Sequence, residues 1–214
     1  AYEFSYDRFL DVVKEVLDSG VDVKIVYDAR KENPRIKNIA AVQAKGLDAP
    51  GVSFQRTQPK SYISHNKIIV KLHEGQPQSV WTGGTNFSEG GIFGHSNVAQ
   101  VVEDQAVSQR FLDYWNHLAE DSTAALLKTS VEALSPLPGG TPSVGTTVLF
   151  SPRRNLNALN WYADRARQAT ESLFMTFAFG MHDVFKNVYG TATAPLRFAL
   201  MEQKTRPMKD GPEK

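Results

Sequence analysis

The apolar positions of this chain alternate between helical and extended spacing. Phe9, Val13 and Leu17 recur at the spacing of one helix face, and Ser19-Gly20 predicts the end of that helix. Residues 21–28 then alternate in polarity and predict a strand. The same alternation predicts further elements: helices over residues 36–45, 105–118, 122–134 and 156–169, and strands over residues 52–56, 62–71, 78–82, 147–150, 173–179 and 195–201. Helices that alternate with strands indicate a layered α/β fold.

A stretch rich in proline and glycine divides the chain. It reads Ser-Pro-Leu-Pro-Gly-Gly-Thr-Pro over residues 135–142, a composition typical of a linker. We therefore expect a first lobe over residues 1–134, a linker over 135–146, and the incomplete beginning of a second α/β lobe over 147–214. Its polar tail, residues 202–214, is predicted to be flexible. The chain starts without Met in a strand-like segment, which indicates a domain cut from a longer protein.

Composition narrows the class of protein. The chain has 214 residues, 41% hydrophobic and 22% charged, which is typical of a soluble globular protein with one or two cores. The net charge of +1 gives no overall attraction to nucleic acid or to an anionic membrane, so any preference for phosphate must be local. The absence of cysteine excludes disulfides and thiolate metal sites. No apolar run has the length of a membrane span and no signal peptide precedes Ala1, so no stable membrane anchor is expected.

Candidate chemistry first appears at His65-Asn66-Lys67, which opens the apolar run Ile68-Ile69-Val70. Alternate side chains of a strand share a face, so His65 and Lys67 are predicted to point the same way. An imidazole can attack phosphorus and carry a phosphoryl group, and an ammonium group neutralises the phosphate oxygens. The pair therefore predicts a phosphate site.

A glycine turn follows at residues 83–88, Gly-Gly-Thr-Asn-Phe-Ser. The glycine pair would let the backbone approach an anion, and Asn86 can donate an amide N–H. We predict that His65, Lys67 and Asn86 are catalytic, and that the substrate-binding residues are Gly83, Gly84, Thr85 and Ser88. The remaining histidines, at positions 73, 95, 117 and 182, fit no ligand spacing, so neither a metal nor another cofactor is expected.

The order of these residues resembles the signature of the phospholipase D superfamily, His-x-Lys-x-x-x-x-Asp followed by Gly-[Gly/Ser]-x-Asn. The resemblance covers roughly the first hundred residues, a usual domain size. It implies that His65 is the nucleophile, Lys67 the phosphate-binding lysine and Asn86 the supporting asparagine. It also implies a layered α/β/α lobe with a mixed central sheet and, after residue 147, a partial second α/β lobe of the same kind.

Two positions depart from that signature. Leu72 stands where the family has aspartate, and Ala99 stands where a later Asn-x-Glu has the glutamate that supports the histidine. Glu74 lies two residues beyond Leu72 and is a candidate replacement. The segment from Leu72 to Gly83 also looks longer than usual, with a polar loop over residues 73–78. This lobe is therefore predicted to be partly degenerate and inactive alone.

Two classes of function remain open. In the first, the intact parent protein is a phosphodiesterase or phosphatidyltransferase that works through a phosphohistidine, needs no metal, and completes its site with a second lobe or a second subunit. Its substrate would be a phosphodiester, either a phospholipid or a nucleic acid. In the second, the lobe binds phosphate or lipid headgroups, or is architectural, without catalysis. A nuclease of the same family is also possible, although the low net charge counts against it.

Overall fold

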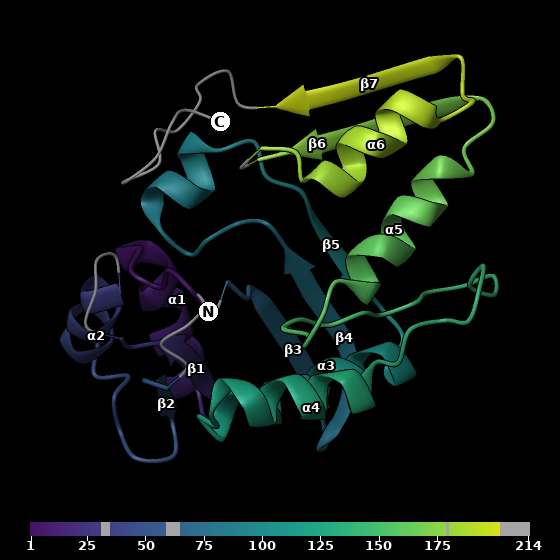
Figure 1. The fold of residues 1–214 in the computed structure, drawn as a ribbon. Coiled ribbons are helices and arrows are strands. Elements are labelled where there is room, and N and C mark those ends of the chain that lie inside the picture. The colour runs from purple at the N-terminus through teal and green to yellow at the C-terminus, as the bar shows by residue number, and fades with distance from the viewer. Residues whose placement is uncertain (31–34, 59–64, 179, 202–214) are drawn as a thin grey trace. The chain divides into compact units, whose positions relative to one another are not determined.

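The structure is a computed structural model that describes residues 1–30, 35–58, 65–178 and 180–201 (Figure 1). The chain divides into two compact units. Unit 1 comprises Ala1–Pro136 and Val144–Arg154, and unit 2 comprises Leu137–Ser143 and Asn155–Lys214. Each unit is described by itself.

Unit 1 begins with two helices and two parallel strands. The order is α1 (Asp7–Asp18), β1 (Ile25–Asp28), α2 (Arg35–Ala44) and β2 (Ser53–Arg56), as the sequence pattern predicted to within a few residues. Ile25 and Tyr27 of β1 pack into the core beneath α1 and α2, whereas Val26 packs into the core on the opposite face. Burial on both faces is typical of a parallel strand between two helical layers.

An antiparallel sheet follows, made of β3 (Ile68–His73), β4 (Gln76–Gly83) and β5 (Ala99–Val102). Glu74 and Gly75 both have positive φ, 50° and 77°, which is the conformation of a two-residue hairpin turn. The polar loop predicted over residues 73–78 is therefore wrong: β3 and β4 run through it and only the turn lies outside them. Strand β5 was not predicted from the sequence.

Helices α3 (Gln105–Ala119) and α4 (Ala124–Leu134) cover one face of unit 1 (Figure 1). The Asp104 side chain caps α3, since its Oδ1 accepts the Val107 N–H at 2.8 Å. Phe111 and Leu118 of α3 pack with Val80 of β4 in the core on this side. The other core lies beneath α1 and α2, so the unit is a layered α/β/α lobe.

The N-terminal segment joins the parallel and antiparallel strands. Ala1 O accepts the Asp28 N–H of β1 at 3.0 Å, and Glu3 O accepts the Phe87 N–H beyond β4, also at 3.0 Å. Phe4 and Phe87 form a parallel β-bridge. The central layer is therefore mixed, as expected.

Asn38 of α2 fixes this segment from one side. Its fully buried side chain donates to Tyr2 O at 2.7 Å and to Asp28 O at 2.9 Å, and accepts the Phe4 N–H at 2.8 Å. All the polar atoms of this buried amide are thus used to hold one stretch of backbone in place.

Residues 144–154 return to unit 1. Phe150 stacks on Tyr114 with ring centroids 4.3 Å apart and meets Phe111 edge-on at 4.9 Å. Arg153 donates to the Ser135 carbonyl at the end of α4. Residues 147–150 are not a strand, so that prediction is wrong. Residues 147–154 belong to unit 1, whereas the second lobe was expected to begin at residue 147.

Unit 2 is a β-α-β arrangement with one preceding helix: α5 (Asn157–Arg167), β6 (Ser172–Phe177), α6 (Asp183–Thr191) and β7 (Leu196–Met201) (Figure 1). Strands β6 and β7 are parallel, and the helices pack on one of their faces around Leu173, Phe185 and Val188. A partial second α/β lobe was predicted, although α6 was not. Position 179, the predicted end of the first strand, and the tail 202–214 lie outside the described residues.

Candidate functional site

His65 and Lys67 lie immediately before β3 rather than inside it. The strand begins at Ile68, and residues 62–64 of the longer strand that was predicted lie outside the described residues. Lys67 does not simply share a strand face with His65, because its Nζ turns back to donate to His65 O at 3.0 Å. His65 is exposed, whereas Lys67 is only 3% exposed. His65 is therefore accessible to solvent, whereas the neighbouring Lys67 side chain is buried.

The aromatic ring of Tyr2 contacts both residues. Its centroid lies 4.7 Å from that of the His65 imidazole, and Lys67 Nζ lies 5.4 Å from the same ring. Aromatic rings attract cations through their negative faces, so Tyr2 stabilises Lys67 and restricts His65. Tyr2 itself is held through its backbone carbonyl by Asn38.

Glu3 brings a carboxylate into the same area. Ser88 Oγ donates to Glu3 Oε2 at 2.6 Å and accepts the Gly91 N–H at 3.2 Å. Glu3 and Ser88 are both half-buried. Ser88 therefore links the predicted glycine turn to the N-terminal segment, and Glu3 is the acidic group at that link.

Asn86 is held rigidly with one polar atom unsatisfied. The residue is 8% exposed, and its buried Oδ1 has no hydrogen-bond partner among the described residues. Gly91, in the short π-helix η1 (Gly90–Gly94), packs so closely that an added Cβ would lie 2.5 Å from Asn86 O. A buried amide without a partner is costly and is typical of a group that binds a ligand. Since the two ends of an amide are interchangeable by rotation, its unpaired end can also present N–H to a phosphate oxygen.

Close packing explains why positions 83 and 84 are both glycine. A Cβ on Gly83 would lie 2.4 Å from Val98 O, and one on Gly84 would lie 3.1 Å from Asn97 Oδ1. The Gly84 N–H is donated to Val98 O at 2.9 Å, so it is not free to bind an anion. Substrate binding by Gly83, Gly84 and Thr85 stays a prediction.

Burial and nearby charges shift the pKa values of His65 and Lys67. The pKa of His65 lies below its usual range because of burial and the nearby Lys67 cation, while the Glu3 carboxylate acts in the opposite direction. Burial lowers the pKa of Lys67 to about 8, again against the influence of Glu3. These shifts favour the neutral imidazole at pH 7 and leave the lysine mostly charged. This is the protonation state that a histidine nucleophile requires.

The positions that depart from the signature hold no carboxylate near this pair. Leu72 is 42% exposed near the end of β3 and pairs with Pro77. Glu74 lies at the hairpin turn, with its side chain 86% exposed and 4.0 Å from that of His73. Strand β3 separates it from Lys67 by roughly 20 Å at the usual rise per residue. Glu74 therefore does not replace the missing aspartate.

Tyr2 and Glu3 were not among the residues predicted for the site. The only signal available was a carboxylate inside an otherwise apolar extended stretch, Ala1 to Phe4. Nothing in the local pattern says that this stretch pairs with Phe87, more than 80 residues away, because that pairing is tertiary.

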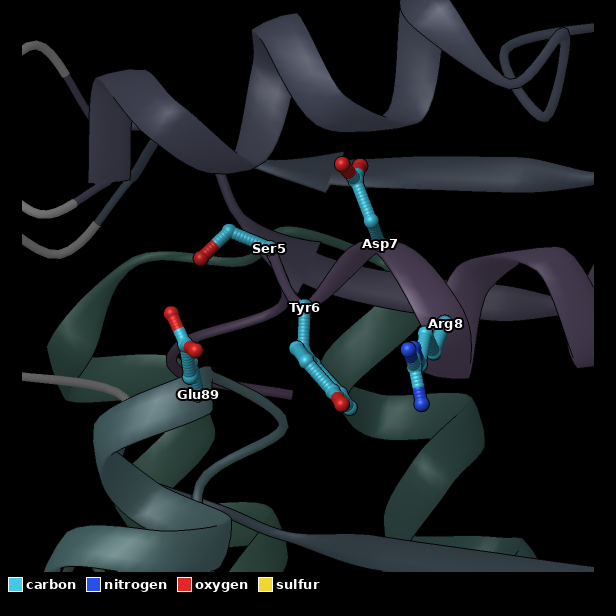
Figure 2. A pocket seen from close by; sticks show the side chains of 5 residues that line it. All are labelled: Ser5, Tyr6, Asp7, Arg8 and Glu89. Atoms are coloured by element: carbon cyan, nitrogen blue, oxygen red, sulfur yellow. The ribbon is translucent and has the colours of Figure 1, made fainter.

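A surface pocket lies at the start of α1 and is lined by Ser5, Tyr6, Asp7, Arg8 and Glu89 (Figure 2). None of the predicted catalytic residues lines it. Over the described ranges, no group of three metal-binding side chains occurs, and no helix is long and apolar enough to span a bilayer.

Comparison with known proteins identifies the family. The family model described as the phospholipase D-like domain of cardiolipin synthase matches residues 1–119, more than half of the chain. The chain belongs to this phospholipase D-like family. The phospholipase D-like domain thus contains every residue predicted for the site, from His65 to Ser88.

A solved structure of a phospholipase D family member, Nuc from Salmonella typhimurium, is similar to this chain. It is 27% identical, and the match covers 56% of this chain and 75% of that chain with a TM-score of 0.46. No curated protein matches the chain.

Proposed function

We propose that the chain belongs to a phosphodiesterase that hydrolyses or transfers a phosphodiester through a phosphohistidine at His65, and that this lobe is inactive alone. The observation that carries the proposal is a solvent-exposed His65 next to the buried Lys67, whose Nζ donates to His65 O at 3.0 Å. Membership of the phospholipase D-like family supports the reaction class.

The first step forms a bond between a His65 ring nitrogen and phosphorus and breaks the bond from phosphorus to the leaving oxygen. The leaving alcohol takes a proton from a general acid. Lys67 uses one N–H for His65 O, which leaves two to neutralise the charge on the non-bridging oxygens. Asn86 adds its amide at the same phosphate.

The second step reverses these roles. The oxygen of water, or of an acceptor alcohol in a transfer reaction, attacks phosphorus while the phosphorus–nitrogen bond breaks. The group that gave its proton to the leaving alcohol takes one from the attacking oxygen, and His65 is regenerated. We assign that acid and base to a second histidine outside this lobe, supplied by a second lobe or a second subunit.

Hydrolysis of bis(p-nitrophenyl) phosphate tests the proposal. We expect little turnover from residues 1–214, more from a chain extended past Lys214, and loss of the additional activity on His65→Ala. An acid-labile, alkali-stable phosphoryl adduct on the peptide that carries His65 would identify the intermediate by mass spectrometry. His73→Ala, at the tip of the β3–β4 hairpin, is the matched control and should keep full activity. Activity that survives His65→Ala would exclude His65 as the nucleophile.

A second function is favoured by Leu72 and Ala99, which remove two carboxylates expected of the signature. In this alternative the lobe binds a phosphate or lipid headgroup without turnover. Titration with dimethyl phosphate, monitored through the NMR signals of His65, distinguishes a catalytic lobe from a binding lobe. Binding without any adduct or product, even in the extended chain, would support a binding lobe, and the low net charge of +1 argues against a nuclease in either case.

A further inference from the structure

Two cations of unit 1 are buried with little compensation. Lys67 and Arg56 are each 3% exposed. The Arg56 nitrogens Nε, Nη1 and Nη2 have no hydrogen-bond partner among the described residues, and its ion-pair contact with Asp121 is long, at 3.9 Å. Burying a cation is costly unless a negative charge lies nearby. The site therefore needs a carboxylate that Leu72 and Ala99 do not provide.

Two other acidic residues among those described near these strands, Asp28 and Asp121, already have partners. Asp28 at the end of β1 pairs with Arg30 at 2.6 Å. Both carboxylate oxygens of Asp121 accept backbone N–H groups of Thr57 and Gln58 at 3.0 to 3.2 Å. These two carboxylates thus contact Arg30, Arg56, Thr57 and Gln58.

Glu3 lies next to Tyr2 in the N-terminal segment and contacts the glycine turn. Its backbone pairs with Phe87, its carboxylate accepts a hydrogen bond from Ser88 at 2.6 Å, and its neighbour Tyr2 contacts both His65 and Lys67. Being half-buried, Glu3 is partly shielded from water and still accessible. The Ser88 hydroxyl fixes the direction of the carboxylate.

We propose that Glu3 is the carboxylate of this site, a positioning residue held by Ser88 that sets the charge carried by His65 and Lys67. This inference rests on the proposed function, because it assigns the group that tunes its nucleophile. The negative charge of Glu3 keeps Lys67 cationic for phosphate binding and raises the basicity of His65, and therefore its nucleophilicity.

The electrostatics of the pair agree with this role. Glu3 raises the pKa of both His65 and Lys67 against the lowering caused by burial. Lys67 lowers the pKa of His65 further. The ring of Tyr2 also contacts both His65 and Lys67.

Titration of His65 by NMR tests the proposal without requiring activity. The five histidines are distinguished by their C–H resonances, with His65→Asn used for assignment. Glu3→Gln keeps the shape of the side chain and its bond to Ser88 but removes the charge. We expect the His65 pKa to fall in Glu3→Gln, to recover in Glu3→Asp, and to stay unchanged in Glu74→Gln, which removes the same charge from the hairpin turn.

The pH dependence of kcat/KM in the extended chain gives the second readout. The acidic limb of the profile should move to lower pH in Glu3→Gln, because His65 then loses its proton at lower pH, whereas the alkaline limb, set by the second histidine as general acid, should stay in place. A merely structural role would lower the rate without moving the acidic limb. An unchanged His65 titration with an unmoved acidic limb would overturn the proposal.

The two proposals can fail separately. If no chain hydrolyses the diester, the proposed function fails, yet the NMR titration still decides whether Glu3 controls His65. If the diester is hydrolysed through His65 but Glu3→Gln leaves the titration unchanged, only the inference about Glu3 fails. Thermal unfolding followed by circular dichroism confirms that each variant is folded.

Discussion

At the scale of single residues, the site depends on a buried cation. Lys67 is 3% exposed, and its pKa of about 8 shows that the fold disfavours its charge. The folded-state pKa lies below the unfolded value of 10.5, so the penalty is fully present below pH 8. It disappears as the pH rises to 10.5, because the lysine is then neutral in both states. A residue kept at such a cost is typical of function rather than of stability.

The substitution Lys67→Met should show whether burial of the charged lysine destabilises the fold. Between pH 8 and pH 10.5, the stability of the natural chain should rise relative to the methionine variant by about 3 kcal/mol, the free energy that corresponds to the lowered pKa. Urea unfolding of both chains at the two pH values measures this difference. Lys71→Met, at an exposed position of β3, should show no such change. A constant difference between natural chain and Lys67→Met would show that the lysine is not penalised by burial.

The residue types of the site were predictable where the motif is local. His65, Lys67 and Asn86 were predicted from the chemistry of two short motifs, His-x-Lys and Gly-Gly-x-Asn, and from their resemblance to the family signature. Glu3 and Tyr2 were not predictable, because they reach the site through the pairing of the N-terminal segment with Phe87. Residues that tune a catalytic group often come from such distant segments.

At the scale of elements, periodicity predicted helices α1 to α5, missed α6, and placed the strand boundaries poorly. Helix α3 matches its predicted range to within one residue, because Val107, Phe111 and Leu118 mark one buried face. Strand β3 runs from Ile68 to His73, whereas the predicted strand covered residues 62–71, of which 62–64 lie outside the described residues. The hairpin turn was missed because its Glu-Gly sequence lies among polar residues that look like a loop.

The π-helix η1 gives an element-scale prediction about Asn86. In Gly91→Ala the new Cβ would lie 2.5 Å from Asn86 O and 2.7 Å from Asn86 Cβ, so backbone must move. We expect a loss of about 1–3 kcal/mol in unfolding free energy, as for other overpacked sites, together with weaker binding of dimethyl phosphate. Chemical denaturation and NMR titration measure the two effects.

Gly90→Ala is the matched control in the same element. A Cβ at Gly90 meets no atom within 4 Å, so the substitution should leave phosphate binding unchanged. Stability should change by no more than about 1 kcal/mol and in the favourable direction, because alanine reduces the freedom of the unfolded chain. Equal effects of the two substitutions would mean that Gly91 does not hold Asn86.

At the scale of the whole molecule, the chain crosses between units more than once. Residues 137–143 belong to unit 2, whereas residues 144–154 return to unit 1. The linker predicted over residues 135–146 therefore contains parts of both units. Composition reveals that the stretch is irregular, but not that Phe150 beyond it fills the core next to Tyr114. A boundary placed from proline and glycine content alone would remove this aromatic side chain from the first lobe.

Truncation of the chain tests whether Phe150 stabilises the first lobe. A chain of residues 1–154 should fold cooperatively, whereas one of residues 1–136 should be less stable by about 3–5 kcal/mol, the usual cost of losing a buried phenylalanine from a core. Phe150 is 6% exposed and its N–H is donated to Ser135 Oγ at 3.0 Å, so the loss includes packing and a hydrogen bond. Phe150→Ala in residues 1–214 should reproduce most of the effect in urea unfolding, and Phe174→Ala, 62% exposed in unit 2, should not. A domain of this size is stabilised by about 5–15 kcal/mol in total, so the chain of residues 1–136 would be close to its limit of stability. Equal midpoints of urea unfolding for the two truncated chains would refute the role of Phe150.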